Sequence, residues 1–199
     1  MLGSITPLGE RGRNSRWTVT AIAHTVGSAV AGVLFGAALG WAGRAAGAPW
    51  GGTLAVLALG SMIAVGAILD MRLLPGAARV PSVRRQVNEN WLTRYRGWVY
   101  GVGFGFQLGL GVVTIVTVSA VYSTFAAAAL SGAPGAGAAI GGVFGLVRGL
   151  SVLSVARVRR PEQLGALHAR ILAWDRPSRR LAIAAELALG AAAVSAAVL

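Results

Sequence analysis

The sequence contains no cysteine and no lysine, and it has only six acidic residues in 199. The lack of cysteine excludes disulfide bonds, thiolate metal sites and thiol redox chemistry. Charged residues make up 12% of the chain and hydrophobic residues 55%, whereas about a quarter of a soluble globular domain is charged. Because no break in composition divides the chain, we predict one membrane domain over residues 1–199.

The 18 basic residues are all arginine and give a net charge of +12, which in a soluble chain would suggest a nucleic-acid-binding protein. Here the arginines flank apolar tracts, and no basic stretch carries interleaved aromatic residues outside those flanks. We therefore expect no nucleic-acid partner, and we expect the lipid bilayer in its place.

Five apolar tracts are long enough to cross a hydrocarbon core about 30 Å thick, which takes about 20 helical residues. The third tract continues to Leu130 and is longer than one span needs, and the fifth stops at the chain end. The pattern predicts an all-α fold, a polytopic transmembrane helix bundle of about five spans. The predicted spans lie near 17–41, 51–70, 98–125, 135–156 and 181–199.

The segments between these tracts differ in arginine content. Sixteen arginines lie in the N-terminal segment and in the loops 71–97 and 157–180, whereas the loop 42–50 has Arg44 alone and the loop 131–134 has no charge. Since cytoplasmic loops carry the excess of arginine, we predict a cytoplasmic N-terminus and an extracytoplasmic C-terminus in the inner membrane of a bacterium. Tryptophans that would form an aromatic belt at the boundaries are Trp17, Trp41, Trp50, Trp98 and Trp174.

Each of the two large cytoplasmic loops contains an amphipathic stretch with apolar residues every three or four positions. We predict two interfacial helices that lie on the membrane surface and bind anionic lipid; ordinary cytoplasmic connectors are the alternative. The apolar positions are Val83, Val87, Trp91 and Tyr95 in the first loop and Leu164, Leu167, Ile171 and Trp174 in the second.

Small residues recur at every fourth position in three of the predicted spans. This spacing lets helix backbones approach closely in lipid, where no hydrophobic attraction acts between helices. We therefore interpret most of the 29 glycines as packing positions. The three ridges are Ser28, Gly32, Gly36 and Gly40; Gly101, Gly105 and Gly109; and Gly141, Gly145 and Gly149.

Four polar side chains interrupt the apolar tracts, namely His24, Gln107, Arg148 and Glu186. A charged group near the middle of the bilayer costs about 2.5–3.5 kcal/mol on insertion scales and needs a partner or water. At about 1.5 Å per helical residue from the cytoplasmic boundary, the four groups lie at a similar depth of roughly 9–14 Å. We predict that they converge between the helices, with Arg148 and Glu186 as an ion pair.

Three interpretations of these four residues stay open. In the first, they form a polar cavity toward the cytoplasm, where Arg148 binds an anionic or zwitterionic solute, Glu186 balances it or carries a proton, and His24 and Gln107 orient it. In the second, they form a polar knot that only fixes helix register. In the third, His24 and Glu186 lie shallow enough to reach the interface.

Other polar residues lie nearer the predicted boundaries or within the third tract. Asp70 stands at the cytoplasmic end of the second span beside Arg72, which predicts a solvated interfacial pair. Thr114, Thr117 and Ser119 either bond back to their own backbone or face a cavity.

No enzyme constellation is present. We find no paired-carboxylate motif, no phosphate loop and no metal-ligand spacing, so we expect neither an enzyme nor a bound cofactor or metal. The glycine-rich run Gly101–Gly105 enters an apolar tract and does not follow a strand of a βαβ unit, which excludes a nucleotide loop.

The third and fourth apolar tracts share a pattern with a known family. A glycine-rich stretch, Gly103–Thr114, leads to a small-residue tract that ends at Leu130, and the short turn Ser131–Pro134 then leads into the tract 135–150. This pattern resembles the fourth and fifth spans of the CcdA/DsbD-type transmembrane thiol–disulfide interchange proteins, within the LysE-like transporters. The tract 17–40 is similar to that family's second span. The family's electron relay uses cysteines, which this chain lacks. The resemblance therefore implies only a fold of pseudo-repeated helices around a central substrate passage.

Together these patterns predict a multi-pass inner-membrane protein that transports or exports a small solute. The alternative is a non-catalytic accessory or scaffold subunit that docks into a larger membrane complex through its glycine ridges. Five spans with short loops make a thin transporter, so we also expect a homodimer or a larger assembly.

Overall fold

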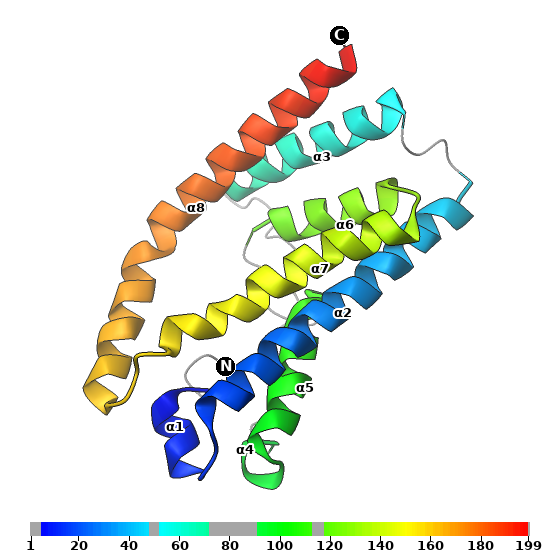
Figure 1. Ribbon diagram of the computed structural model, residues 1–199. Coiled ribbons are helices and arrows are strands. Elements are labelled where there is room, and N and C mark those ends of the chain that lie inside the picture. Colours follow the sequence, from blue (N-terminus) through cyan, green and yellow to red (C-terminus); the bar gives the residue numbers. More distant parts are fainter. Residues whose placement is uncertain (1–4, 48–51, 72–90, 113–117, 199) are drawn as a thin grey trace.

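The computed structural model describes residues 5–47, 52–71, 91–112 and 118–198, and all regular elements within these ranges are helical (Figure 1). Four of them are long and apolar enough to cross a membrane. These are α2 (Trp17–Ala45), α3 (Thr53–Met71), α7 (Pro134–Leu150) with its 3₁₀ extension η1 (Ser151–Val155), and α8 (Pro161–Val198). The shorter helices are α1 (Pro7–Gly12), α4 (Trp91–Arg94), α5 (Gly97–Leu110) and α6 (Ala120–Leu130).

The tract that we predicted as one span over 98–125 contains two helices, α5 and α6. Both run parallel to α2: α5 packs along its first half, with Gly105 against the backbone of His24, and α6 reaches its second half, with Ala129 against Gly43. The physical reason for the break is Gly111, which takes φ of 70° and ends α5. A helix cannot continue through this left-handed conformation.

A substitution at Gly111 tests whether the break requires glycine at this position. A Cβ there would lie 2.5 Å from the Phe125 ring and 3.0 Å from the Phe144 ring. We expect Gly111→Ala to destabilise the protein by about 2–4 kcal/mol, from the positive φ and from crowding. Gly47, with φ of 65° and no atom within 4 Å of such a Cβ, is the matched control. Equal shifts of the thermal midpoint in detergent for Gly111→Ala and Gly47→Ala would contradict the crowding.

α2 packs most extensively against α7, and the two helices are antiparallel. Glycines of one helix lie against backbone carbonyls of the other along the whole contact. A Cβ on Gly141 would lie 2.0 Å from the carbonyl oxygen of Gly32, and one on Gly137 would lie 2.2 Å from that of Gly36. Only glycine permits this approach, so these positions set the distance between the two helices.

α3 and α8 form a second antiparallel pair, in which Gly60 lies against Gly190 and Ala193. α8 is one helix of 38 residues. The predicted connector 157–180 and the predicted span 181–199 are therefore largely continuous, and the second amphipathic stretch is the first half of this helix. Figure 1 shows α8 bent near its middle, where Pro177 removes a backbone donor. Residues 83–90 of the first amphipathic stretch lie outside the described ranges.

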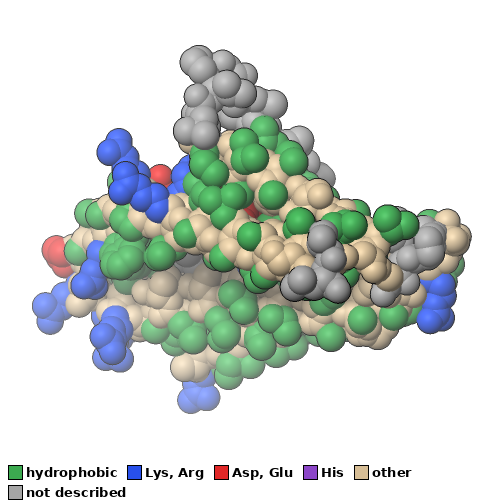
Figure 2. All heavy atoms as spheres, turned by 90° about the horizontal axis from the view of Figure 1, so that it is seen from above, with side chains coloured by type: hydrophobic (Ala, Val, Ile, Leu, Met, Phe, Trp, Pro, Cys, Tyr) green, Lys and Arg blue, Asp and Glu red, His purple; other side chains and the backbone are tan. Residues whose placement is uncertain are grey.

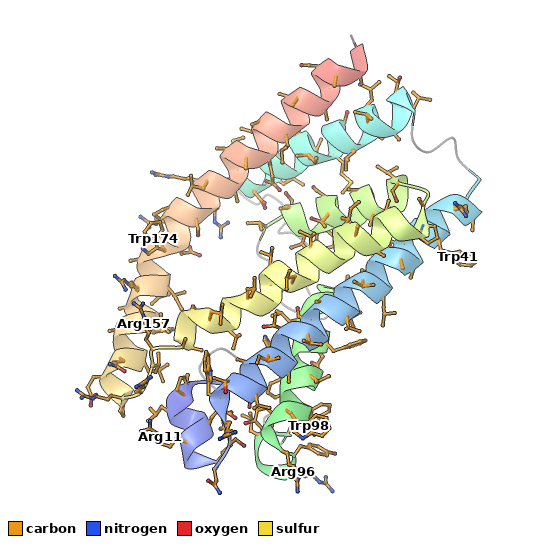
Figure 3. All side chains as sticks on the ribbon, in the orientation of Figure 1. Arg11, Trp41, Arg96, Trp98, Arg157 and Trp174 are labelled. Atoms are coloured by element: carbon orange, nitrogen blue, oxygen red, sulfur yellow. The ribbon has the colours of Figure 1, made fainter. Side chains whose placement is uncertain are left out.

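Large apolar side chains cover the outer surface of the long helices, as on Ile22 of α2 (65% exposed), Val143 of α7 (64%) and Leu189 of α8 (63%). Most basic side chains gather toward one end in Figure 2. Figure 3 places the exposed Trp41 and Trp98 at opposite ends of the bundle. An apolar surface of this extent on long helices indicates a membrane location.

Candidate functional site

His24 lies on the α5-facing side of α2 and is 3% exposed. Its backbone packs on Gly105, and neither ring nitrogen has a hydrogen-bond partner within the described ranges. Gln107 lies one turn from the end of α5 and is half-buried. The two residues thus occupy neighbouring helices, and no hydrogen bond joins them in the described part of the chain.

Arg148 lies on α7, and its guanidinium carbon is 5.3 Å from the centre of the Phe144 ring. This is the distance of a cation–π contact. The Phe144 ring also touches Gly111, because a Cβ on that glycine would lie 3.0 Å from it. The Phe144 ring thus contacts both Arg148 and the residue that ends α5.

Glu186 lies on α8, is 4% exposed and accepts a hydrogen bond from the Ser119 hydroxyl at 2.8 Å. Its second oxygen, Oε2, is buried and has no hydrogen-bond partner in the described ranges. The carboxylate of Glu186 thus bonds Ser119 and not Arg148, and the ion pair that we predicted between Arg148 and Glu186 is not formed.

A second carboxylate binds the same serine. The backbone N–H of Ser119 donates to Oδ2 of Asp70 at 2.6 Å. Asp70 is 4% exposed, so the prediction that its carboxylate is solvated is wrong; Arg72, the predicted partner, lies outside the described ranges. Because Ser119 is the N-cap residue of α6, two buried carboxylates meet where the chain resumes a helix after the break. We call Asp70, Ser119 and Glu186 the carboxylate site.

The carboxylate site and Arg148 stand at the two sides of one break. The Phe144 ring, which contacts Arg148, approaches Gly111 at the end of α5, and the carboxylates bond Ser119, which precedes α6. The positive end of the α6 dipole favours negative charge at Ser119. This arrangement presents a cation on one side and two acids on the other, with one acid oxygen unsatisfied.

Comparison with protein-family profiles, with curated proteins and with solved structures found no match. The resemblance to thiol–disulfide interchange proteins therefore stays a prediction. The chemistry of the site has to be argued from its own residues.

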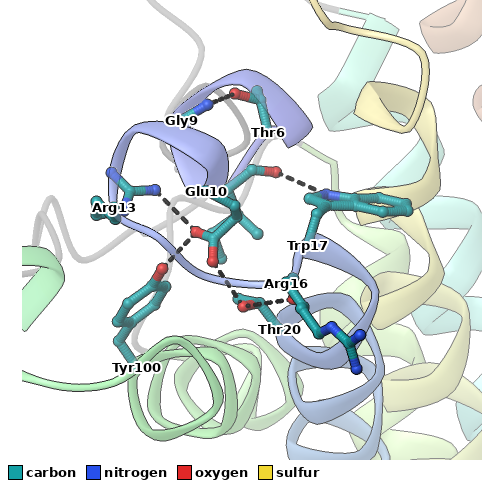
Figure 4. Close-up of polar contacts among 9 residues, drawn as sticks. Thr6, Gly9, Glu10, Arg13, Arg16, Trp17, Thr20 and Tyr100 are labelled. Carbon is teal, nitrogen blue, oxygen red and sulfur yellow. Dashed lines mark hydrogen bonds and ion pairs between the residues drawn. The ribbon is translucent and has the colours of Figure 1, made fainter.

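A separate polar cluster lies at the basic end of the bundle and is centred on Glu10 of α1, which is fully buried (Figure 4). Its carboxylate accepts hydrogen bonds from Arg13 at 2.8 Å, from the Thr20 hydroxyl at 2.7 Å and from the Tyr100 hydroxyl. Burial alone would lower the pKa of the Arg13 guanidinium, but its hydrogen bonds to Glu10 and Tyr100 outweigh this and raise it. Glu10 thus joins α1 to α2 and α5.

Sequence reasoning missed Asp70 and Glu10 as interior residues. Asp70 was assigned to the interface because it ends the second span beside Arg72, and Glu10, which precedes the first apolar tract, was given no role. Ser119 was expected to bond back to its own backbone or to face a cavity, and its bonds to two carboxylates were not foreseen; Thr114 and Thr117 lie outside the described ranges. The usable signal for the break before Ser119 was the length of the tract 98–130, which exceeds a single span.

Proposed function

We propose that this chain is a multi-pass membrane protein that transports a small solute, with proton coupling at the carboxylate site. The observation that carries the proposal is the convergence of Asp70 and Glu186 on Ser119 at a break between two helices that run along α2. Irregular backbone within a membrane is tolerated where it is buried in protein or lines a cavity. Discontinuous helices of this kind hold the substrate and coupling-ion sites of many transporters.

The unsatisfied oxygen of Glu186 indicates what the site binds. Two ionised carboxylates that bond the same serine repel each other, and burial away from water raises the free energy of both charges further. A proton on Oε2 of Glu186 would remove the repulsion and would leave the hydrogen bond from the Ser119 hydroxyl to Oε1 in place. The residue can therefore gain and lose a proton without rearranging its other contacts.

On the other side of the break, we propose that Arg148 binds an anionic group of the solute. Its guanidinium lies over an aromatic ring that also touches Gly111, and a planar guanidinium pairs well with carboxylate or phosphate. His24 and Gln107 would orient the solute from α2 and α5. With the N-terminus in the cytoplasm, as the distribution of arginine suggests, protons and solute would cross at the break.

Proton movement in liposomes tests the proposal. Protein reconstituted around an internal pH-sensitive dye should acidify or alkalinise the lumen when a potassium diffusion potential is imposed with valinomycin. We expect Glu186→Gln, which keeps the acceptor for Ser119 and cannot ionise, to reduce the rate to that of empty liposomes. Glu162→Gln is the matched control, because Glu162 is exposed in the first turn of the same helix.

Two results would refute proton coupling: a wild-type rate equal to that of protein-free liposomes, or a Glu186→Gln rate equal to that of the wild type. Either result would favour the accessory-subunit alternative, in which the carboxylate site only holds α3, α6 and α8 together.

A further inference from the structure

A second site is indicated by a cleft of about 760 Å³ at the basic end of the bundle. It lies between the start of α2 and the junction of α4 with α5, beside the Glu10 cluster and apart from the carboxylate site. Among the described residues that line it are four arginines and no acidic residue. They are Arg13, Arg16, Arg94 and Arg96.

The charge of this cleft is not balanced within the described ranges. Arg13 forms the one ion pair found there, with the buried Glu10. Arg16, Arg94 and Arg96 are exposed and have no acidic side chain within ion-pair distance in the described part of the chain. Three guanidinium groups therefore face one solvent-filled space, where their mutual repulsion favours an anionic ligand.

Two helix ends add to this potential. Arg16 and Arg96 are the N-cap residues of α2 and α5, and neither side chain caps its helix. The two helices are parallel, so their positive ends point into the same cleft. Backbone N–H groups at such ends bind phosphate and carboxylate oxygens.

The outer edge of the cleft is aromatic and apolar. Tyr95 is 46% exposed and Trp98 is 54% exposed, and Val19 and Leu92 line the wall beside them. Figure 3 shows Arg96 and Trp98 together at the start of α5. Exposed tryptophan and tyrosine are typical of the level of lipid headgroups, so the arginines face the zone where phosphates lie.

We propose that this cleft binds a phosphate group, held by Arg16, Arg94 and Arg96. Guanidinium groups bind phosphate through paired, charge-assisted hydrogen bonds, and three of them at one cleft match a group with several anionic oxygens. The phosphate belongs either to the headgroup of an anionic lipid or to a soluble molecule. Both sources present the same chemistry to the arginines.

Native mass spectrometry of the full chain in detergent tests the site. The protein is titrated with phosphatidylglycerol, with phosphatidylcholine and, in a separate arm, with inorganic phosphate. We expect the triple variant Arg16→Gln/Arg94→Gln/Arg96→Gln to weaken anion binding at least about tenfold, the loss that one charge-assisted hydrogen bond accounts for. The control is Arg44→Gln, which removes a charge from an exposed position in the last turn of α2, away from the predicted lipid-binding loops, and should change binding less than about threefold.

Substitution of the same three arginines by lysine keeps the charge and removes the paired donors, so it should weaken anion binding less than the triple glutamine variant does. This lysine variant also serves as a control if the triple glutamine variant misfolds. Binding of phosphatidylglycerol alone assigns a lipid headgroup, binding of inorganic phosphate alone assigns a soluble ligand, and competition between them assigns both. Equal losses in the two glutamine variants, or no preference for phosphatidylglycerol over phosphatidylcholine together with no phosphate binding, would overturn the proposal.

Discussion

Replacement of Gly141 by valine is expected to prevent α2 and α7 from packing and to cost more than about 4 kcal/mol, in the range of exceptional single substitutions. The reason is that a Cβ at this position would lie 2.0 Å from the carbonyl oxygen of Gly32 and 2.9 Å from the Cα of Gly36. Both neighbours are backbone atoms, so no side chain can rotate away. The two helices would have to separate, and the contact along their length would be lost.

Size-exclusion chromatography and thermal unfolding in detergent measure this effect. Gly135→Val is the matched control, because Gly135 lies in the first turn of the same helix and a Cβ there would meet no atom within 4 Å. Both substitutions introduce a β-branched residue into α7, so helix propensity is held nearly constant. A Gly141→Val protein that elutes and unfolds like the Gly135→Val protein would show that the helices do not approach as described.

The second large effect is expected for Glu10→Ala, at about 3–5 kcal/mol, the usual cost of removing one partner of a buried ion pair. Truncation leaves the Arg13 guanidinium and the hydroxyl groups of Thr20 and Tyr100 without their shared acceptor. Thr20 and Tyr100 are each 1% exposed, so water cannot replace the carboxylate without opening the cluster. The loss should detach α1 and loosen the start of α2 against α5.

Hydrogen exchange of residues 5–20, together with the thermal midpoint, reports on this cluster. Glu162→Ala removes an equal charge from an exposed position in α8 and should leave both measurements nearly unchanged. Glu10→Gln keeps an acceptor oxygen and should fall between Glu10→Ala and the wild type. If Glu10→Ala and Glu162→Ala behave alike, the cluster does not hold the end of the bundle.

The sequence predicted the long apolar helices well, because hydropathy is a local property of the chain. The tract 17–41 became α2, and the tract 51–70 became α3 with a shift of one or two residues at its ends. The start of α7 at Pro134 was placed within one residue, since a proline favours the first turn of a helix. These elements needed no knowledge of their neighbours.

The break at Gly111 could not be predicted in the same way. Gly103, Gly105 and Gly109 precede it and look alike in sequence, yet only Gly111 among them has a positive φ. What distinguishes it is the pair of rings, Phe125 and Phe144, that approach it from α6 and α7. The continuity of α8 escaped prediction for the opposite reason, because Pro177 and the neighbouring arginines are typical of a loop but the helix runs through them.

The candidate site shows the same limit. Glu186 was recognised as an unusual interior acid, but its partner was chosen by charge and depth alone. The actual contacts join Ser119 to Asp70 across 49 residues and to Glu186 across 67 residues. Depth along single helices places groups at similar levels without saying which helices are neighbours. Arg148 and Glu186 were therefore paired, although Glu186 bonds Ser119 and Arg148 lies over the Phe144 ring.

The separation into two helix groups has a mechanical consequence. α3 and α8 pack on each other, whereas α2 holds α5 and α7, and α6 touches both groups. The hydrogen bonds of Ser119 to Asp70 and Glu186 therefore join the α3–α8 pair to the helices around α2. Under the proposed proton coupling, ionisation of Glu186 would add repulsion from Asp70 at this junction, and protonation would remove it. One proton would then set how strongly the two groups of helices hold together.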